Sequence, residues 1–186
     1  IINIDNLKKA QDLHSNQILS SIPEGVKTIL DVGSGSGGLA EKLVDNNYEV
    51  ECVSPSNYLS DAIEQKLDSS VIVHRSTFES FDSQKKYDLI LFSESFQYVN
   101  IKKTLNKIPN IIKEKGHLLI CDFFRQPGTG TKPLGGGHDW GVFERVLSSH
   151  EFLELKDIDI TKETARTYDL ISQILDEVAG PVKDLS

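Results

Sequence analysis

The feature that most constrains this 186-residue chain is a glycine-rich turn that directly follows an apolar run. Ile29, Leu30 and Val32 are typical of a buried strand, and the apolar residues from Leu39 onward have helical spacing. Between them lies Gly-x-Gly-x-Gly-Gly, residues 33–38. Glycine lets the backbone approach a ligand closely, and the following helix points its N-terminal N–H groups at whatever occupies the turn. The strand–turn–helix unit therefore predicts a nucleotide or cofactor site.

Asp31, an acid two residues before the first glycine, helps to decide which kind of ligand this turn binds. Gly33, Gly35 and Gly38 also fit G-x-G-x-x-G, the spacing of dinucleotide-binding folds. A carboxylate at the strand end would repel a pyrophosphate, but it suits a cationic or amine-bearing ligand. A helix-entry turn that binds nothing is the third alternative, and so many glycines at one strand end disfavour it.

Residues 30–37, Leu-Asp-Val-Gly-Ser-Gly-Ser-Gly, closely resemble the first signature of the class I S-adenosylmethionine-dependent methyltransferases. The resemblance covers residues 24–123 firmly and residues 124–160 loosely. It implies that S-adenosylmethionine is the cofactor and that the acid and the turn hold its methionine end. The residues that it assigns to this role are Asp31, Gly33, Ser34, Gly35 and Gly37.

The second signature of the family departs from its usual pattern in this chain. The family usually ends its second strand with an acid for the ribose hydroxyls, whereas here the strand is followed by Ser54 and Pro55. A dinucleotide-binding fold also requires an acid about 20 residues after the glycines. The absence of an acid at position 54 therefore weakens both the methyltransferase and the dinucleotide-binding interpretation. Ser54 and Pro55 are expected either to contact the ribose or to form an ordinary helix-entry turn.

The third and fourth strand ends supply the remaining cofactor residues that the resemblance implies. Thr77 stands where the family often has an acid near the adenine amine, and Phe78 is expected to offer backbone groups there. Ser93 and Glu94 are candidates near the sulfonium and the methionyl amine, because a carboxylate suits a positively charged cofactor.

Strands and helices alternate along the chain, which predicts a doubly wound, mostly parallel α/β sheet in three layers, α/β/α, as in the Rossmann-like methyltransferase fold. Such sheets bind ligands beyond the carboxyl ends of their strands. We expect strands near 27–32, 48–53, 71–73, 87–92 and 117–123, with a sixth over 152–160. We expect helices over 3–21, 37–46 and 161–179, one capped by Ser56, one over 101–112 that Pro109 kinks or breaks, and one containing Phe143.

The length predicts a single methyltransferase domain over residues 1–186. Its parts are an N-terminal helix (1–22), the cofactor-binding core (23–123), a Gly-rich lid (124–140) and a C-terminal part (141–186). The family fold has a seventh, antiparallel strand, so either that strand is missing from the C-terminal part or the sheet ends at six.

Two residues after the fifth strand are the candidate catalytic groups. Asp122 lies at the strand end, where it could reach an acceptor or hydrogen-bond the nearby loop. His138 follows a glycine run, and an imidazole can take a proton at neutral pH. Its alternative role is to cap the helix that Asp139 opens. No metal site is predicted, because the cysteines and histidines lack ligand spacing.

Composition narrows the partners and the compartment. A net charge of −8 disfavours nucleic acid and anionic membranes, which select for basic patches. No apolar run approaches a membrane span and no signal peptide is visible, so no membrane partner is expected. Two cysteines without a spacing pattern predict a reduced, cytoplasmic protein. The sequence leaves the oligomeric state open.

The function expected from the resemblance is in-line transfer of the methyl group of S-adenosylmethionine to a small-molecule acceptor. One alternative is an NAD(P)-dependent oxidoreductase, which rests on the glycine spacing. Another is a non-catalytic cofactor-binding subunit of the same fold. Stabilisation by S-adenosylhomocysteine but not by NAD would exclude the oxidoreductase, and turnover would separate the other two.

Overall fold

The computed structural model describes residues 4–126, 137–162 and 164. The chain forms two compact units, one of residues 1–17 with 153–186 and one of residues 18–152. Helix α1 (Ile4–Ser21) confirms the predicted N-terminal helix and begins in the first unit. None of the described helices is long and apolar enough to cross a membrane.

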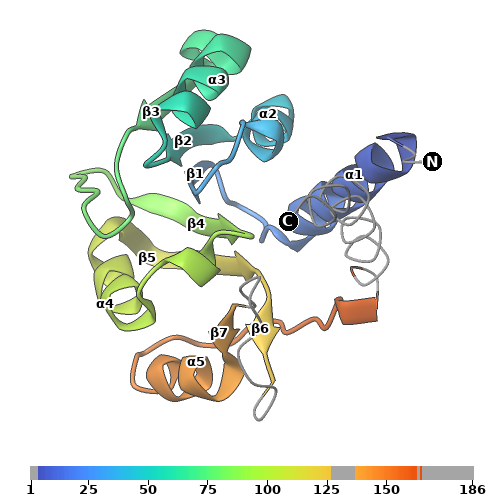
Figure 1. Cartoon of the computed structure of the whole chain (residues 1–186). Helices are drawn as coiled ribbons and strands as arrows, with labels where there is room; N and C mark the ends of the chain where they lie inside the picture. Colours follow the sequence, from blue (N-terminus) through green and yellow to red (C-terminus); the bar gives the residue numbers. More distant parts are fainter. Residues whose placement is uncertain (1–3, 127–136, 163, 165–186) are drawn as a thin grey trace, which may run out of the picture. The chain divides into compact units, whose positions relative to one another are not determined.

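The unit of residues 18–152 contains a parallel five-stranded sheet in the order β3-β2-β1-β4-β5 (Figure 1). This order confirms the predicted doubly wound α/β fold. The strands are β1 (Thr28–Val32), β2 (Glu49–Val53), β3 (Val71–His74), β4 (Tyr87–Ser93) and β5 (Ile112–Cys121). The helices are α2 (Gly38–Asp45), α3 (Asn57–Leu67), α4 (Ile101–Ile111) and α5 (Trp140–Leu147), with short 3₁₀ turns η1 (Asp68–Ser70) and η2 (Phe96–Tyr98). A separate pair joins β6 (Phe124–Arg125) to β7 (His138–Asp139).

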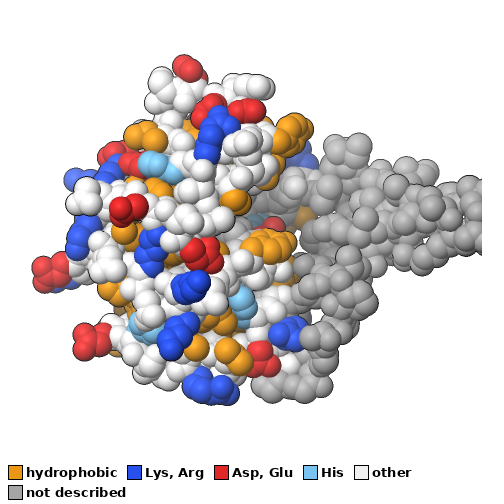
Figure 2. Space-filling view, turned by 60° about the vertical axis from the view of Figure 1, so that its left-hand side comes forward, with side chains coloured by type: hydrophobic (Ala, Val, Ile, Leu, Met, Phe, Trp, Pro, Cys, Tyr) orange, Lys and Arg blue, Asp and Glu red, His pale blue; other side chains and the backbone are white. Residues whose placement is uncertain are grey.

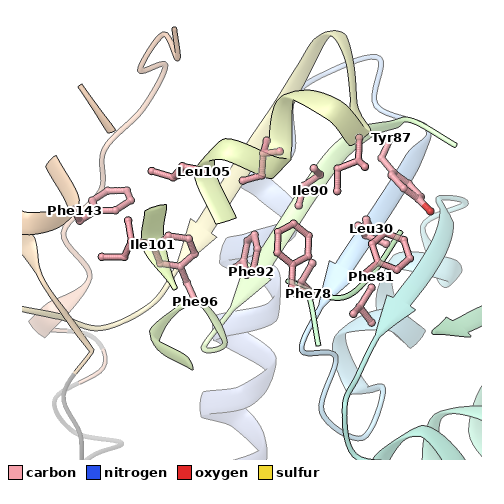
Figure 3. Close-up of a cluster of buried hydrophobic side chains, with 14 residues drawn as sticks. Leu30, Phe78, Phe81, Tyr87, Ile90, Phe92, Phe96, Ile101, Leu105 and Phe143 are labelled. Carbon is pink, nitrogen blue, oxygen red and sulfur yellow. The ribbon is translucent and has the colours of Figure 1, made fainter. Parts of the chain in front are cut away.

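The central strands bury both faces, because consecutive side chains point to opposite sides of a sheet. In β1, Ile29 packs in the cluster that includes residues of α2 and α3, whereas Leu30 packs in the cluster of α4 and α5. Figure 3 shows the second cluster, where Phe92 lies between Phe78 and Phe96. Both neighbouring rings meet the ring of Phe92 edge-on, with centroids 5.2 Å away. The sheet is thus covered by helices on both sides.

Helix boundaries follow the predicted capping chemistry. Ser56 accepts a hydrogen bond from the Leu59 N–H and opens α3, as expected from the sequence. Asp139 caps α5 in the same way through the Val142 N–H. Pro109 does not break α4 at once, because the helix continues for two residues to Ile111 before it ends.

The predicted sixth strand over 152–160 is wrong for this structure. Residues 151–160 have no regular secondary structure, and Leu153 and Leu155 are 83% and 67% exposed. Alternating polarity favours an extended chain, but a strand also needs a partner edge to satisfy its N–H and C=O groups. Of the helix predicted over 161–179, residues 161, 162 and 164 are helical, and the remainder lies outside the described residues.

Candidate functional site

The carboxyl ends of the five parallel strands lie at one edge of the sheet. Val32 pairs with Val53 on one side and with Phe92 on the other. The first residues beyond the strands continue this register, because the Gly33 N–H donates to the Val53 carbonyl at 2.8 Å. The Glu94 N–H likewise donates to the Cys121 carbonyl at 2.8 Å. The edge therefore brings together the candidate residues after β1, β2, β4 and β5, around the β1–β4 switch point where such folds bind ligands.

The turn after β1 is held tightly at one glycine and open at another. Gly33 has φ +76°, and a Cβ atom placed on it would lie only 2.4 Å from the Cβ of Ser95. Gly35 has φ +55°, and a Cβ atom there would meet nothing within 4 Å. The backbone at Gly35 thus faces open space that a ligand can fill, while Gly33 fixes the turn to the end of β4.

Asp31 is the buried acid of this site. Its side chain is 1% exposed, and its Oδ2 has no hydrogen-bond partner among the described residues. Burial raises the pKa of the Asp31 carboxyl from 3.8 to about 6, and a hydrogen bond from Ser34 opposes this effect in part. An orphaned carboxylate oxygen is costly inside a protein. A cation or N–H donor that reached this oxygen would therefore bind favourably.

Ser95 is a site residue that sequence reasoning missed in favour of Ser93 and Glu94. Its buried hydroxyl donates to the Val32 carbonyl at the end of β1. Ser93 is half-buried, and Glu94 is exposed with φ +54°. The available signal was a small residue close to a strand end, but only the fold shows that it faces Gly33.

The end of β2 presents a neutral hydroxyl. Ser54 is 2% exposed, its N–H donates to the His74 carbonyl at 3.0 Å, and its Oγ accepts from the Ser56 N–H at 3.4 Å. Pro55 beside it is exposed. Glu51 cannot serve in place of the usual ribose acid, because its buried carboxylate accepts hydrogen bonds from His74, Lys85 and Tyr87.

Two hydroxyl groups follow β3, and they differ in whether they form a hydrogen bond. The Thr77 hydroxyl donates to the Ser80 hydroxyl at 3.2 Å and accepts from the Ser80 N–H at 3.3 Å. The Phe78 side chain is 2% exposed and belongs to the core, so only its backbone is available to a ligand. The Ser76 Oγ is buried without a partner among the described residues. Ser76, which the sequence did not single out, is therefore a further candidate.

The two candidate catalytic residues both contact the turn that follows β4. Asp122 accepts hydrogen bonds from the N–H groups of Gln97 at 2.9 Å and Phe123 at 2.7 Å. Burial raises the pKa of the Asp122 carboxyl, and these hydrogen bonds oppose the rise. His138 Nε2 lies 2.9 Å from the Phe96 carbonyl oxygen. Because a carbonyl only accepts, this nitrogen carries the hydrogen, which leaves Nδ1 as the proton acceptor.

The ends of the predicted lid are joined to each other. Phe124 and Arg125 of β6 pair with His138 and Asp139 of β7, and Arg125 Nε donates to the Gly137 carbonyl at 3.0 Å. Residues 127–136 lie outside the described residues. The N-cap of α5 is Asp139, so its neighbour His138 does not take the capping role considered for it.

Among the described residues, no group of three or more His, Cys, Asp and Glu side chains is arranged to hold a metal ion. The glycine turn after β1, the buried acid at its start and the sheet order together define a Rossmann-like cofactor-binding domain. Residues 8–158 match the family model described as a methyltransferase domain, and the chain belongs to this family.

Several proteins to which this chain is similar are named as methyltransferases. The ubiquinone biosynthesis O-methyltransferase of Rickettsia bellii is 24% identical over 158 residues, which cover 76% of this chain and 65% of that protein. A putative sarcosine dimethylglycine methyltransferase from Galdieria sulphuraria superposes with a TM-score of 0.75 at 16% identity, covering 94% of this chain and 72% of that one. Geranyl diphosphate C-methyltransferase from Streptomyces coelicolor gives a TM-score of 0.77 at 15% identity, covering 87% and 65%. The chain therefore spans less than two thirds of the Rickettsia relative, and the structural likenesses show the shared fold.

Proposed function

We propose that this protein binds S-adenosylmethionine and transfers its methyl group to a small-molecule acceptor. The observation that carries the proposal is Asp31, a buried carboxylate with an unpartnered oxygen at the end of β1, next to a turn that leaves open space at Gly35. This pair of features fits a ligand with an ammonium group and a compact polar chain. The carboxylate does not fit a pyrophosphate, which it would repel.

The residues at the strand ends fit the parts of this cofactor in order. Asp31 and the turn from Gly33 through Ser34 and Gly35 to Gly37 would hold the methionine end. Ser54 and Pro55 would meet the ribose, and Thr77, the backbone of Phe78 and the Ser76 hydroxyl would meet the adenine. Ser93 and Glu94 would lie near the sulfonium. When bound, S-adenosylmethionine supplies a methyl group activated by positively charged sulfur.

The protein's own part in the reaction is to orient the acceptor, exclude water and remove a proton where the acceptor is a hydroxyl or amine. His138 would take that proton on Nδ1, while Nε2 stays bonded to the Phe96 carbonyl. This bond fixes the ring and its tautomer. Asp122 is the second candidate base, and its raised pKa keeps it closer to the neutral range than an exposed aspartate.

The acceptor class is proposed as a small molecule rather than a nucleic acid. Similar proteins include a ubiquinone biosynthesis O-methyltransferase, a geranyl diphosphate C-methyltransferase and a ribosomal RNA methyltransferase, so two of these three names favour a small molecule and none identifies the compound. On the face shown in Figure 2, acidic and basic side chains are interspersed. A chain of net charge −8 with this pattern would gain little from phosphate contacts. The proposed compartment is the cytoplasm, where isolated thiols stay reduced.

The proposal is tested by ligand-induced thermal stabilisation followed by turnover. S-adenosylhomocysteine is expected to raise the Tm, whereas NAD and NADP leave it unchanged. Release of S-adenosylhomocysteine is then measured with a panel of phenols, amines, carboxylates and isoprenoid diphosphates. Stabilisation by NAD instead would support the oxidoreductase, and binding without turnover on any acceptor would support the non-catalytic alternative.

A further inference from the structure

The connection between β3 and β4, residues 75–86, contains no helix. Thr77 and Phe78, near its start, belong to the candidate site. A side chain from elsewhere holds it. Lys107, on α4, points its Nζ at three main-chain carbonyls of this connection: Phe78 at 2.8 Å, Glu79 at 3.0 Å, and Phe81. An ammonium has three N–H donors, so all of them are used.

The surroundings of Lys107 show that this contact is built in. Its side chain is half-buried, and its Nζ lies 5.5 Å and 5.8 Å from the ring centroids of Phe78 and Phe81. A second link joins the same turn to the start of α4, because the Glu79 carboxylate accepts from the Asn100 N–H at 2.9 Å. The turn at 77–81 is thus fastened to α4 by a half-buried cation and a carboxylate.

The other end of the connection is anchored independently. Lys85 donates to Glu49 and Glu51, and the Tyr87 hydroxyl donates to Glu51. Loss of the Lys107 amine would therefore release the turn at 77–81 while the chain stays attached at β4. The local consequence would be a change in the position of Ser76, Thr77 and the Phe78 backbone.

We propose that Lys107 is a positioning residue for the cofactor: it fixes the segment from Ser76 to Phe78 that receives the adenine end. This inference rests on the proposed function and adds to it a residue far from the strand ends in sequence. The role is specific to one end of the cofactor, since the methionine end is held by Asp31 and the turn after β1.

The experiment compares Lys107→Met with Lys103→Met, a matched variant at an exposed lysine one turn earlier on α4. Calorimetry measures the affinity for two ligands: 5′-methylthioadenosine, which contains the adenine end without the amino acid, and S-adenosylhomocysteine, which contains both ends. Lys107→Met is expected to weaken the affinity for both ligands by about tenfold, the scale for loss of a charged hydrogen-bond donor. Lys103→Met is expected to leave both affinities unchanged. The KM for S-adenosylmethionine should rise while the acceptor KM stays unchanged.

Asp31→Asn is the comparison variant for the methionine end: it is expected to weaken S-adenosylhomocysteine binding and to leave 5′-methylthioadenosine binding unchanged. A merely structural role for Lys107 would lower the Tm and leave the affinity of the folded protein for both ligands unchanged. Wild-type affinity for both ligands in Lys107→Met would overturn the inference and leave the proposed function intact, whereas a wild-type protein that binds neither ligand would overturn the proposed function itself. Should Lys107→Met fail to fold, Lys107→Gln, which keeps one N–H₂ group, is measured with the same expectation.

Discussion

Ser95 occupies the space that a side chain at Gly33 would need: the added Cβ atom would lie 2.4 Å from the Cβ of Ser95. The Ser95 hydroxyl also donates to the Val32 carbonyl, one residue before this glycine. The last residue of β1 and the turn after β4 are therefore locked together at the switch point of the sheet. Because the candidate cofactor site is built on both, its shape depends on this contact.

Gly33→Ala is expected to destabilise the fold and to weaken cofactor binding. The substitution meets Ser95 and also forces alanine to φ +76°, where an L-residue costs at least about 1 kcal/mol. Urea unfolding and calorimetry with S-adenosylhomocysteine measure the two effects. Ser95→Gly removes the clash together with the bond to the Val32 carbonyl, so the double variant Gly33→Ala/Ser95→Gly is compared with Ser95→Gly alone. Gly33→Ala should cost less stability in the Ser95→Gly background than in the wild type, and an equal cost in both would show that the contact with Ser95 is not the cause.

Gly35→Val is expected to abolish cofactor binding with only a modest loss of stability. The valine side chain would fill the open space beside the turn, where we propose that the ligand contacts the protein backbone. Gly25→Val is the matched control, because Gly25 also has positive φ and open surroundings but precedes β1, away from the strand carboxyl ends. Calorimetry should find the control binding normally. Normal binding in Gly35→Val would exclude this turn as the cofactor site.

Asp31→Asn is expected to make the ligand-free protein more stable at pH 7 and to weaken cofactor binding. The folded pKa of about 6 lies above the ordinary 3.8, so ionising the buried carboxyl costs stability. Wild-type stability should fall as pH rises from about 4 to about 6 and then stay level, by up to about 3 kcal/mol in total. The amide of the variant does not titrate, so the unfolding free energies of the two proteins should differ least below about pH 4. A wild-type stability that does not change across this range would show that the carboxyl keeps its ordinary pKa.

The same titration sets the pH dependence of cofactor affinity. An ionised Asp31 attracts the ammonium of the cofactor, so affinity for S-adenosylhomocysteine should increase through pH 6 in the wild type and not in Asp31→Asn. Calorimetry across this range measures it. Equal affinity of the two proteins at pH 7 would remove Asp31 from the cofactor site.

His138→Ala is expected to leave cofactor affinity nearly intact and to lower turnover by about 10²-fold, the scale for loss of a general base. His138→Gln is the sharper variant, because its amide can still donate to the Phe96 carbonyl but cannot take a proton. Turnover should fall equally in both variants. A Gln variant with wild-type turnover would leave Asp122 as the candidate base.

The sheet and its binding edge were predictable because their signals are local. Apolar runs mark β1 and β4, and Asp31 with the glycines marks the turn between β1 and α2. After the third strand, Phe78 was expected to offer its backbone, and its ring is buried in the core. Ser76 was not singled out, because no local pattern indicates that its hydroxyl is buried without a partner among the described residues.

The contacts that set the site's geometry join residues far apart in the chain. Ser95 reaches Val32, and Lys107 reaches the carbonyls near Phe78, so no local spacing encodes either contact. The predicted strand over 152–160 failed for the opposite reason: its local pattern is present, but in the described structure no partner edge pairs with it.

The pairing of β6 with β7 brings together two segments that are far apart in the chain. Phe124 pairs with His138, and the Arg125 Nε donates to the Gly137 carbonyl, so these residues lie next to each other although they are more than ten positions apart in the chain. The ladder therefore sets the position of His138, the candidate base, near the end of β5.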